Sequence, residues 1–352
     1  MYVRKQPMST AAAIKSPTTV PAPAPLSPKR IADIAWSYAG PLIVEAAIRN
    51  RVFDTLDAGP KTIEEVHSAT GASMRGLTAV MNALSGLQLL DKDAQGRYSL
   101  TPESATFLVS TKASFFGGLF LHTSEQLLPR WLNLTEIVDT GKPATSVNQQ
   151  DTGAAFFEQF VCDIFPMSYP SAQTLATALQ LSKEKVLDLA AGSGVWGIAL
   201  ALESPGVRVT AIDWPNVLEV TRKTVARFGL EDRFRFLPGD LLTINFDSGY
   251  TVATLGHILH SEGEERSRRL LAKTFAALAP GGTIAIAEFL VDNDRKGPIT
   301  SLYFAVNMLV NTDNGNTFSF EEISAWLREA GFIEPRRLDS PGPSPLILAT
   351  KP

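Results

Sequence analysis

The fold is decided by residues 185–197, which read KVLDLAAGSGVWG. Residues 186–189 form a short apolar run of the kind that becomes a buried strand, and a helix is expected from about Gly194 to Ala201. The small residues between the two let the backbone turn tightly and approach a ligand closely. The free N–H groups of the first helical turn favour an anionic group. The stretch therefore predicts a strand, a ligand-binding turn and a helix.

The same alternation of strand and helix continues along the rest of the chain. Strands are expected at 207–212, 234–237, 251–255, 283–288 and 346–349, and helices at 217–228, 264–278 and 320–330. Such alternation, with short β-rich runs, is typical of a parallel, doubly wound sheet. Ligands of these sheets bind at the carboxyl ends of the strands, near the point where the strand order reverses. We therefore predict an α/β domain over residues 181–352.

Residues 31–110 have the pattern of a winged helix, with a capped helix from about Thr62, a turn at Gly71, a second helix through Leu87 and a hairpin at 89–100. The region holds six Lys or Arg residues against nine Asp or Glu residues, and the second helix carries Arg75 as its one base. A DNA-recognition helix needs bases for phosphates. The pattern favours packing against another protomer, and no nucleic-acid partner is expected.

The remaining segments are a tail and a linker. Residues 1–30 hold six prolines and five bases with no acid, which predicts a disordered tail and not a targeting helix. Residues 111–180 look mainly helical, with a polar loop at 141–153, and their aromatic side chains predict core packing and part of a substrate pocket.

Overall composition adds further limits. The formal net charge of −4 gives no basic field for nucleic acid. No apolar run reaches the roughly 20 residues that span a bilayer, so no membrane partner is expected. The single cysteine, Cys162, allows no internal disulfide and favours a reducing cytoplasmic setting. The four histidines are too scattered for a zinc signature, and no metal site is expected.

Acidic residues stand on three successive expected strands. Asp188 lies four residues before Gly192, where a carboxylate can address a cationic amino group or hold the loop. Asp213 can accept both hydroxyls of a ribose, and Asp240 can meet an adenine amino group. Residues 192–197 also fit G-x-G-x-x-G, so a dinucleotide is an alternative. The three acids suit an adenosine ligand with a positive amino acid tail better than a pyrophosphate.

The ordered set of motifs resembles class I S-adenosylmethionine-dependent methyltransferases. The resemblance rests on residues 188–194, 212–215 (IDWP), 238–240 (PGD) and 278–282 (LAPGG), in matching order and spacing. With the winged-helix half, His260 and residues 329–332 (EAGF), nearly all of 31–352 resembles the small-molecule O-methyltransferases of plant caffeic-acid and bacterial natural-product type. It implies a seven-stranded Rossmann-like sheet, S-adenosylmethionine as cofactor, and a homodimer through N-terminal domains that also close the substrate pocket.

The resemblance also implies the cofactor contacts. In that family the first motif reads D-x-G-G-G-x-G, and Ala190 and Ala191 replace two glycines here. The segment around Phe160 and Ser168 resembles the helix that covers the methionyl end, with Ile164 where the family usually has Met. The other residues expected at the cofactor are Asp188, Ala190, Gly192, Gly194, Asp213, Trp214, Asp240 and Leu241.

His260 is the expected general base. A phenol or enol acceptor must lose its proton, and a histidine suits that task. The resemblance places the family's base at His260, whereas a capping histidine at the start of the 264–278 helix is the structural alternative. His257 is expected to pack near the cofactor or the strand end. The bases Arg266, Arg268 and Arg269 are expected on a solvated helix face, with binding of an acidic substrate as the other interpretation.

Two departures from the family concern this base. Ser261 and Glu262 follow His260 where relatives have Asp and an aromatic residue, and Ala305 and Phe320 stand where orienting acids are usual. The candidate acids for the orienting role are Glu262, Glu321, Glu322 and Asp313. Without an orienting carboxylate, a nucleophile that needs little deprotonation gains weight.

The leading hypothesis is therefore O-methylation of a small hydroxylated metabolite. S-methylation of a small thiol or thioether, driven mainly by proximity, is the first alternative. A nicotinamide-dependent oxidoreductase would follow from the glycine pattern, and a winged-helix regulator that senses an adenosine ligand is the non-enzymatic alternative.

Overall fold

The structure is a computed structural model that describes residues 26–147 and 150–352. Most of the tail expected to be disordered, residues 1–25, lies outside the described residues. The described residues belong to two compact units, which divide between Ala39 and Gly40. In the first unit, α1 (Lys29–Trp36) buries none of its residues. Its large apolar side chains Ile31, Ile34 and Trp36, and Tyr38 beyond it, are exposed.

One helical stretch of the described residues, Lys29–Arg49, is long and apolar enough by composition to cross a membrane, since an 18-residue window within it has a mean hydropathy of 1.3. It joins α1 to α2 (Ala39–Arg49) and includes Asp33 and Glu45. This corrects the expectation that no apolar stretch has the necessary length. Core helices of soluble proteins meet the same test of length and composition.

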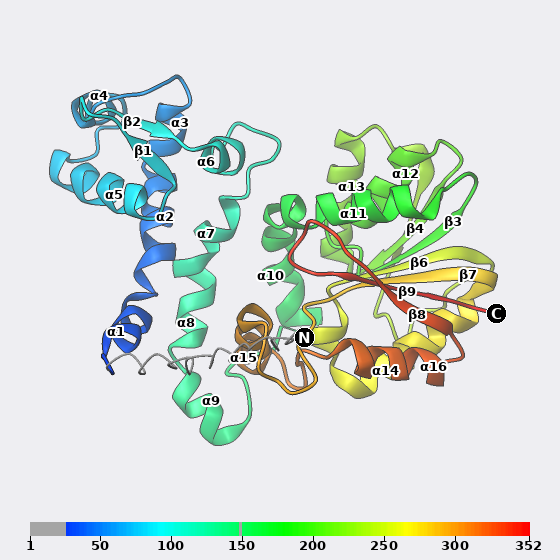
Figure 1. Cartoon of the computed structure of the whole chain (residues 1–352). Coiled ribbons are helices and arrows are strands. Elements are labelled where there is room, and N and C mark those ends of the chain that lie inside the picture. The colour runs from blue at the N-terminus through cyan, green and yellow to red at the C-terminus, as the bar shows by residue number, and fades with distance from the viewer. Residues whose placement is uncertain (1–25, 148–149) are drawn as a thin grey trace, which may run out of the picture. The chain divides into compact units, whose positions relative to one another are not determined.

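The predicted winged-helix elements are present in the second unit (Figure 1). Thr62 caps α4 in a reciprocal pair with Glu65, and Gly71 ends that helix with a left-handed backbone. Ser73 caps α5, and an antiparallel hairpin follows. The elements are α2, α3 (Val52–Leu56), α4 (Ile63–Thr70), α5 (Met74–Gly86), β1 (Leu90–Lys92), β2 (Tyr98–Leu100) and α6 (Pro102–Phe107). Their apolar faces enclose one core that includes Phe53, Met81 and Tyr98.

A helical segment connects this region to the sheet, as predicted. Its elements are α7 (Gly118–His122), the π-helix η1 (Thr123–Leu127), α8 (Leu128–Trp131), α9 (Leu134–Thr140), α10 (Gln150–Asp163) and α11 (Phe165–Leu179). The buried carboxylate of Glu45 accepts hydrogen bonds from Arg49 and Ser124, which joins α2 to η1. The loop expected at 141–153 is shorter than predicted, because α10 already begins at Gln150.

The sheet has seven strands in the order β5-β4-β3-β6-β7-β9-β8, and the first five are parallel to one another. β9 runs antiparallel to both β7 and β8. The strands are β3 (Lys185–Leu189), β4 (Arg208–Asp213), β5 (Phe234–Pro238), β6 (Tyr250–Gly256), β7 (Leu278–Ala287), β8 (Ile333–Leu338) and β9 (Leu346–Thr350). The doubly wound, mainly parallel sheet is confirmed.

Helices cover both faces of the sheet because successive strand residues point to opposite sides. Leu187 of β3 joins the core formed with α14 and α16, whereas Val186 joins the core formed with α11 and α12 (Figure 1). The helices of this part are α12 (Val195–Glu203), α13 (Pro215–Arg227), the short 3-10 helix η2 (Glu231–Arg233), α14 (Leu259–Ala277), α15 (Ile299–Asn311) and α16 (Phe320–Glu329). The strand order reverses between β4 and β6, on either side of β3, which predicts a crevice at that point.

Candidate functional site

A pocket lies at the carboxyl ends of the central strands, where the topology predicts it. Four short segments that follow β3, β4, β5 and β6 form its floor, and α10 and α11 supply apolar side chains. The segments contribute residues 190–193, 213–214, 239–241, 256–258 and 260–262. The helical part contributes Phe157, Val161, Ile164 and Ser168.

The turn after β3 is held in an unusual backbone conformation. Ala190, Gly192 and Gly194 all have positive φ angles, of 53°, 56° and 80°. Left-handed residues at alternate positions turn the chain sharply. The Gly192 N–H donates to Asp213 at 2.9 Å, and the Ala191 N–H donates to the Ile212 carbonyl at 3.1 Å. The turn after β3 is therefore fixed to the end of β4.

Asp213 lines the pocket and accepts two backbone hydrogen bonds, from Gly192 and from Trp214 at 2.7 Å. Burial raises the pKa of its carboxyl to about 6, although the two N–H donors act in the opposite direction. Among the residues that the structure describes, no Lys, Arg or His forms an ion pair with it. Each oxygen keeps a second lone pair for a hydroxyl donor.

Asp188 does not line the pocket, which corrects one of its two expected roles. Its side chain is fully buried beneath the turn and accepts hydrogen bonds from the Thr254 hydroxyl at 2.7 Å and the Gly197 N–H at 3.0 Å. Burial raises the pKa of Asp188 to about 7. A Cβ on Gly197 would lie 2.9 Å from this carboxylate, so the glycine permits the contact. These contacts fit the second expected role of Asp188, which is to hold the loop.

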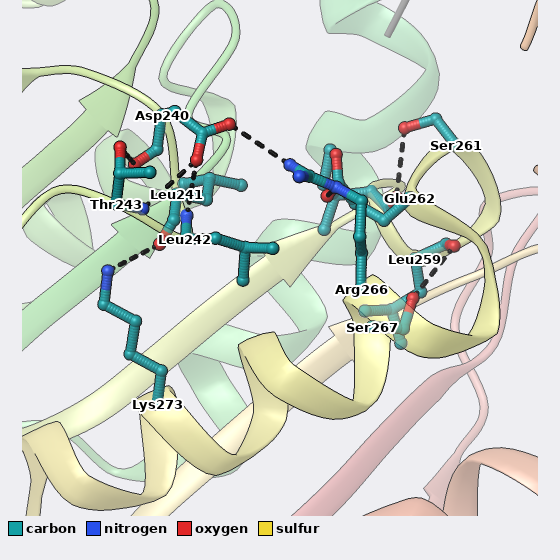
Figure 2. Close-up of polar contacts among 11 residues, drawn as sticks. Asp240, Leu241, Leu242, Thr243, Leu259, Ser261, Glu262, Arg266, Ser267 and Lys273 are labelled. Carbon is teal, nitrogen blue, oxygen red and sulfur yellow. Dashed lines mark hydrogen bonds and ion pairs between the residues drawn. The ribbon is translucent and has the colours of Figure 1, made fainter. Parts of the chain in front are cut away.

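Asp240 is on the pocket wall but is already engaged (Figure 2). One carboxylate oxygen accepts from the N–H groups of Leu242 at 2.9 Å and Thr243 at 3.1 Å, and the other pairs with Arg266 at 3.1 Å. Burial opposes ionisation, but these donors outweigh it and lower the pKa of Asp240 below its ordinary value. Lys273 donates to the Leu241 carbonyl at 2.7 Å and fixes the same loop from α14.

His260 lines the pocket in the first turn after β6, and a carboxylate orients it. Its Nδ1 lies 2.8 Å from one oxygen of Glu288, and its backbone N–H donates to the other at 3.2 Å. Glu288 directly follows β7 and is buried. Burial works against its charge, but the attraction and hydrogen bonds of His260 keep the pKa of Glu288 below its ordinary value. The acid that holds Nδ1 is thus Glu288, which is not one of the four suggested by the sequence, Glu262, Glu321, Glu322 and Asp313. Glu262 pairs with Arg266 and Glu322 with Arg295.

Aromatic rings surround this base. The Phe304 ring of α15 meets the His260 ring edge-on at 4.8 Å, and Phe289 lies 4.2 Å from Phe304 between ring centroids. His257, at a φ of 60°, bonds Ser344 at 2.9 Å, and burial lowers its pKa to about 4. His257 is therefore neutral near pH 7 and packs at the strand end, as expected.

The structure brings most, but not all, of the expected residues together. Those that line the pocket are Ala190, Gly192, Asp213, Trp214, Asp240, Leu241, Ser168 and His260. Phe160 does not line it, because it stacks on Phe156 at 5.3 Å and meets His122 edge-on at 5.5 Å. Phe157 and Val161 of α10 and Ile164, the residue that precedes α11, line the pocket instead. Gly194 does not line the pocket and is the N-cap residue of α12.

Comparisons with known proteins give a consistent result. Residues 141–333 match the sequence profile of the O-methyltransferase domain, and residues 32–110 match that of the O-methyltransferase dimerisation domain. The chain is 31% identical over 333 residues to 3-hydroxy-5-methyl-1-naphthoate 3-O-methyltransferase of Streptomyces sahachiroi, covering 92% of this chain and 95% of that protein. It is 27% identical to the tetracenomycin polyketide synthesis 8-O-methyl transferase TcmO of Streptomyces glaucescens, over 92% of this chain and 97% of that one. The human N-acetylserotonin methyltransferase in complex with S-adenosylmethionine has the same fold, with a TM-score of 0.82 at 22% identity, covering 94% of this chain and 99% of that one.

Proposed function

Because this chain belongs to the O-methyltransferase family, we propose that His260 is the general base of an S-adenosylmethionine-dependent transfer of a methyl group to a hydroxyl oxygen of a small organic metabolite. The observation that carries the assignment is the buried contact of 2.8 Å between His260 Nδ1 and Glu288 at the edge of the pocket. A carboxylate on one ring nitrogen leaves the other available to accept a proton.

The lining residues fit S-adenosylmethionine. Asp213, Asp240 and Glu262 put carboxylates on the pocket wall, and no Lys or Arg is among the described residues that line the pocket. Such a wall suits a cationic ligand with hydroxyl and amino donors, whereas a pyrophosphate would face three carboxylates. Asp213 would hold the ribose hydroxyls, and Phe157, Val161 and Ile164 would cover the ligand. When bound, the cofactor supplies a methyl group on a sulfonium, which already has a good leaving group.

The residues of the chain then have two tasks, proton removal and alignment. With Glu288 on Nδ1, the neutral ring carries its hydrogen there and presents the Nε2 lone pair to the acceptor hydroxyl. Glu288 remains ionised and stabilises the imidazolium that forms when Nε2 takes the proton. Phe304 and Phe289 pack beside the ring and keep water from it, and the aromatic surface also suits an apolar acceptor.

The alternative of thiol or thioether methylation loses its main support. It depended on the lack of an orienting carboxylate beside His260, and Glu288 supplies that carboxylate. The three acids that line the pocket likewise weaken the dinucleotide alternative.

The remaining assignments concern organisation and partners. We infer that residues 31–110 form a homodimer, that 111–180 link them to the pocket, and that 181–352 bind the cofactor, as the two matched profiles support. Nine acids against six bases in residues 31–110 support no nucleic-acid partner. We also place the enzyme in the cytoplasm, because its single cysteine, Cys162, favours a reducing setting.

Two substitutions test the base. With a hydroxyl acceptor found by following S-adenosylhomocysteine release, His260→Ala is expected to lower kcat by about 10²- to 10⁴-fold at several pH values. Glu288→Gln keeps the shape but removes the charge that stabilises the imidazolium, so a loss of about tenfold or more is expected. Calorimetric affinity for S-adenosylhomocysteine is the control and should stay near wild type. Turnover near wild type in His260→Ala would remove this residue from the base role.

A further inference from the structure

Arg266 differs from its neighbours in the basic run of α14. Arg268 pairs with Glu264 at 2.8 Å and with Glu329 on an exposed surface, as expected for a solvated helix face. Arg266 instead turns toward the pocket and pairs with two acids at once (Figure 2). Its Nη2 lies 3.1 Å from Asp240, and its Nε lies 2.5 Å from Glu262. Arg266 therefore differs from Arg268 in its partners and not in its exposure, since the two side chains are 35% and 37% exposed.

Both acids belong to the pocket wall, but they come from different segments. Asp240 stands on the loop after β5, at the end of the pocket assigned to the adenosine. Glu262 lies two residues after His260, and its side chain is only 8% exposed. Burial raises the pKa of Glu262, and pairing with Arg266 opposes that effect. Two carboxylates share one guanidinium, which leaves a net negative charge beside a cationic ligand.

The turn that carries His260 is separated from the rest of α14. Gly263 has φ 73° and ψ 174°, which interrupts the helix between Glu262 and the following residues. A Cβ at Gly263 would lie 2.4 Å from the Asn314 carbonyl, so the break is packed tightly. The salt bridge from Arg266 to Glu262 spans this break, and the Asn316 N–H holds the His260 carbonyl at 2.8 Å.

From these contacts we propose that Arg266 is a positioning residue that couples the adenosine end of the cofactor pocket to the turn bearing the base. The proposal rests on the proposed function for the identity of the two ends. Arg266 itself is not among the residues that line the pocket. It acts by holding Asp240 and Glu262 at a fixed separation through the planar fork of one guanidinium.

A cycle of variants tests the coupling through binding as well as turnover. Arg266→Met is expected to weaken S-adenosylhomocysteine affinity about tenfold and to lower kcat, because it releases both acids. Glu262→Gln is expected to weaken binding in the wild type and to have no further effect in Arg266→Met, because Glu262 acts through Arg266. Arg268→Met removes a neighbouring arginine of the same helix and should leave both values near wild type.

Arg266→Lys keeps the charge but replaces the planar fork by one ammonium group. It is therefore expected to recover only part of the affinity that Arg266→Met loses. If Glu262→Gln has the same effect in both backgrounds, Glu262 acts independently of Arg266 and the proposal is overturned. Wild-type affinity in Arg266→Met would also overturn it. Failure of the wild type to methylate any hydroxyl acceptor would instead refute the proposed function, since the binding cycle needs no acceptor.

Discussion

At the scale of single residues, acids close together in space have different tasks because their partners differ. Asp188 is enclosed by Thr254 and Gly197 and shapes the turn. Asp213 accepts a hydrogen bond from the N–H of Gly192, which lies 21 positions away in the sequence, and it keeps lone pairs on the pocket side. Burial raises the pKa of both, to about 7 and about 6. Of these two acids, only Asp213 lines the pocket, so only its protonation can respond directly to a ligand.

This coupling predicts that cofactor binding depends on pH near 6. Hydroxyl donors favour the ionised carboxylate, so binding should lower the pKa of Asp213 from about 6 and release a proton near that pH. Affinity for S-adenosylhomocysteine should therefore weaken as pH falls below about 6 and level off above it. Calorimetry in two buffers of different ionisation enthalpy measures the proton release.

Asp213→Asn is the control for this prediction. It should weaken binding about tenfold or more and remove the proton release. Proton release of the same size in Asp213→Asn would assign the titration to another group.

At this scale the sequence located most of the site residues. It did not show which side chains of α10 line the pocket or which acid contacts His260. Asp213, Asp240 and His260 follow strands, and strand ends of one parallel sheet meet at one edge. Phe160 does not line the pocket, although it lies three and four positions from Phe157 and Ile164, because its ring packs against Phe156 and His122. No local signal in the sequence predicts these tertiary contacts. Glu288 was missed because it is 28 positions from His260, and only the pairing of β6 with β7 brings the two together.

At the scale of elements, the packing of one helix against one strand end shapes the pocket floor. Trp196 of α12 is buried and lies against Gly256, the last residue of β6. A Cβ on Gly256 would lie 1.8 Å from the indole nitrogen of Trp196. The glycine therefore lets helix and strand approach, and both residues line the pocket.

Gly256→Ala is expected to destabilise the fold by about 1–3 kcal/mol, because a filled core cannot take an added methyl group without moving Trp196. It should also weaken S-adenosylhomocysteine binding, since Trp196 can move only toward the pocket or the core. Thermal unfolding and calorimetry measure the two effects. Gly86→Ala, in an open helical position, is the control and should be neutral or slightly stabilising. An unchanged melting temperature in Gly256→Ala would contradict the packing argument.

The elements themselves were largely predictable, since period and capping are local signals. Thr62 and Glu65 stand at the spacing of a capping box, and the structure forms it. Boundaries were less predictable where the signal is not local. β7 begins at Leu278, five residues before the apolar run, because Tyr250 of β6 pairs there across an irregularity.

At the scale of the whole molecule, the N-terminal helix has apolar side chains that its own unit leaves uncovered. Ile31, Ile34 and Trp36 are 72%, 58% and 68% exposed. An exposed apolar group of this kind marks an interaction site. The match of residues 32–110 to a dimerisation domain indicates a second copy of this chain as the partner.

Light scattering is therefore expected to give a mass twice the 38.0 kDa of one chain. Ile34→Glu together with Trp36→Glu should shift the mass toward the monomer, because two charges would be buried in the interface. Leu132→Glu changes an apolar side chain that is 83% exposed outside this helix and should leave the mass unchanged. A monomeric wild type, or one that sediments with lipid vesicles through residues 29–49, would contradict the prediction.

The proton-handling pair stands on the sheet and not on the helices around it. His260 comes just after β6 and Glu288 just after β7, while Phe304 reaches the same ring from α15. Because neighbouring parallel strands hold both members of the pair, residues of α15 other than Phe304 can be varied without replacing a group that contacts the base.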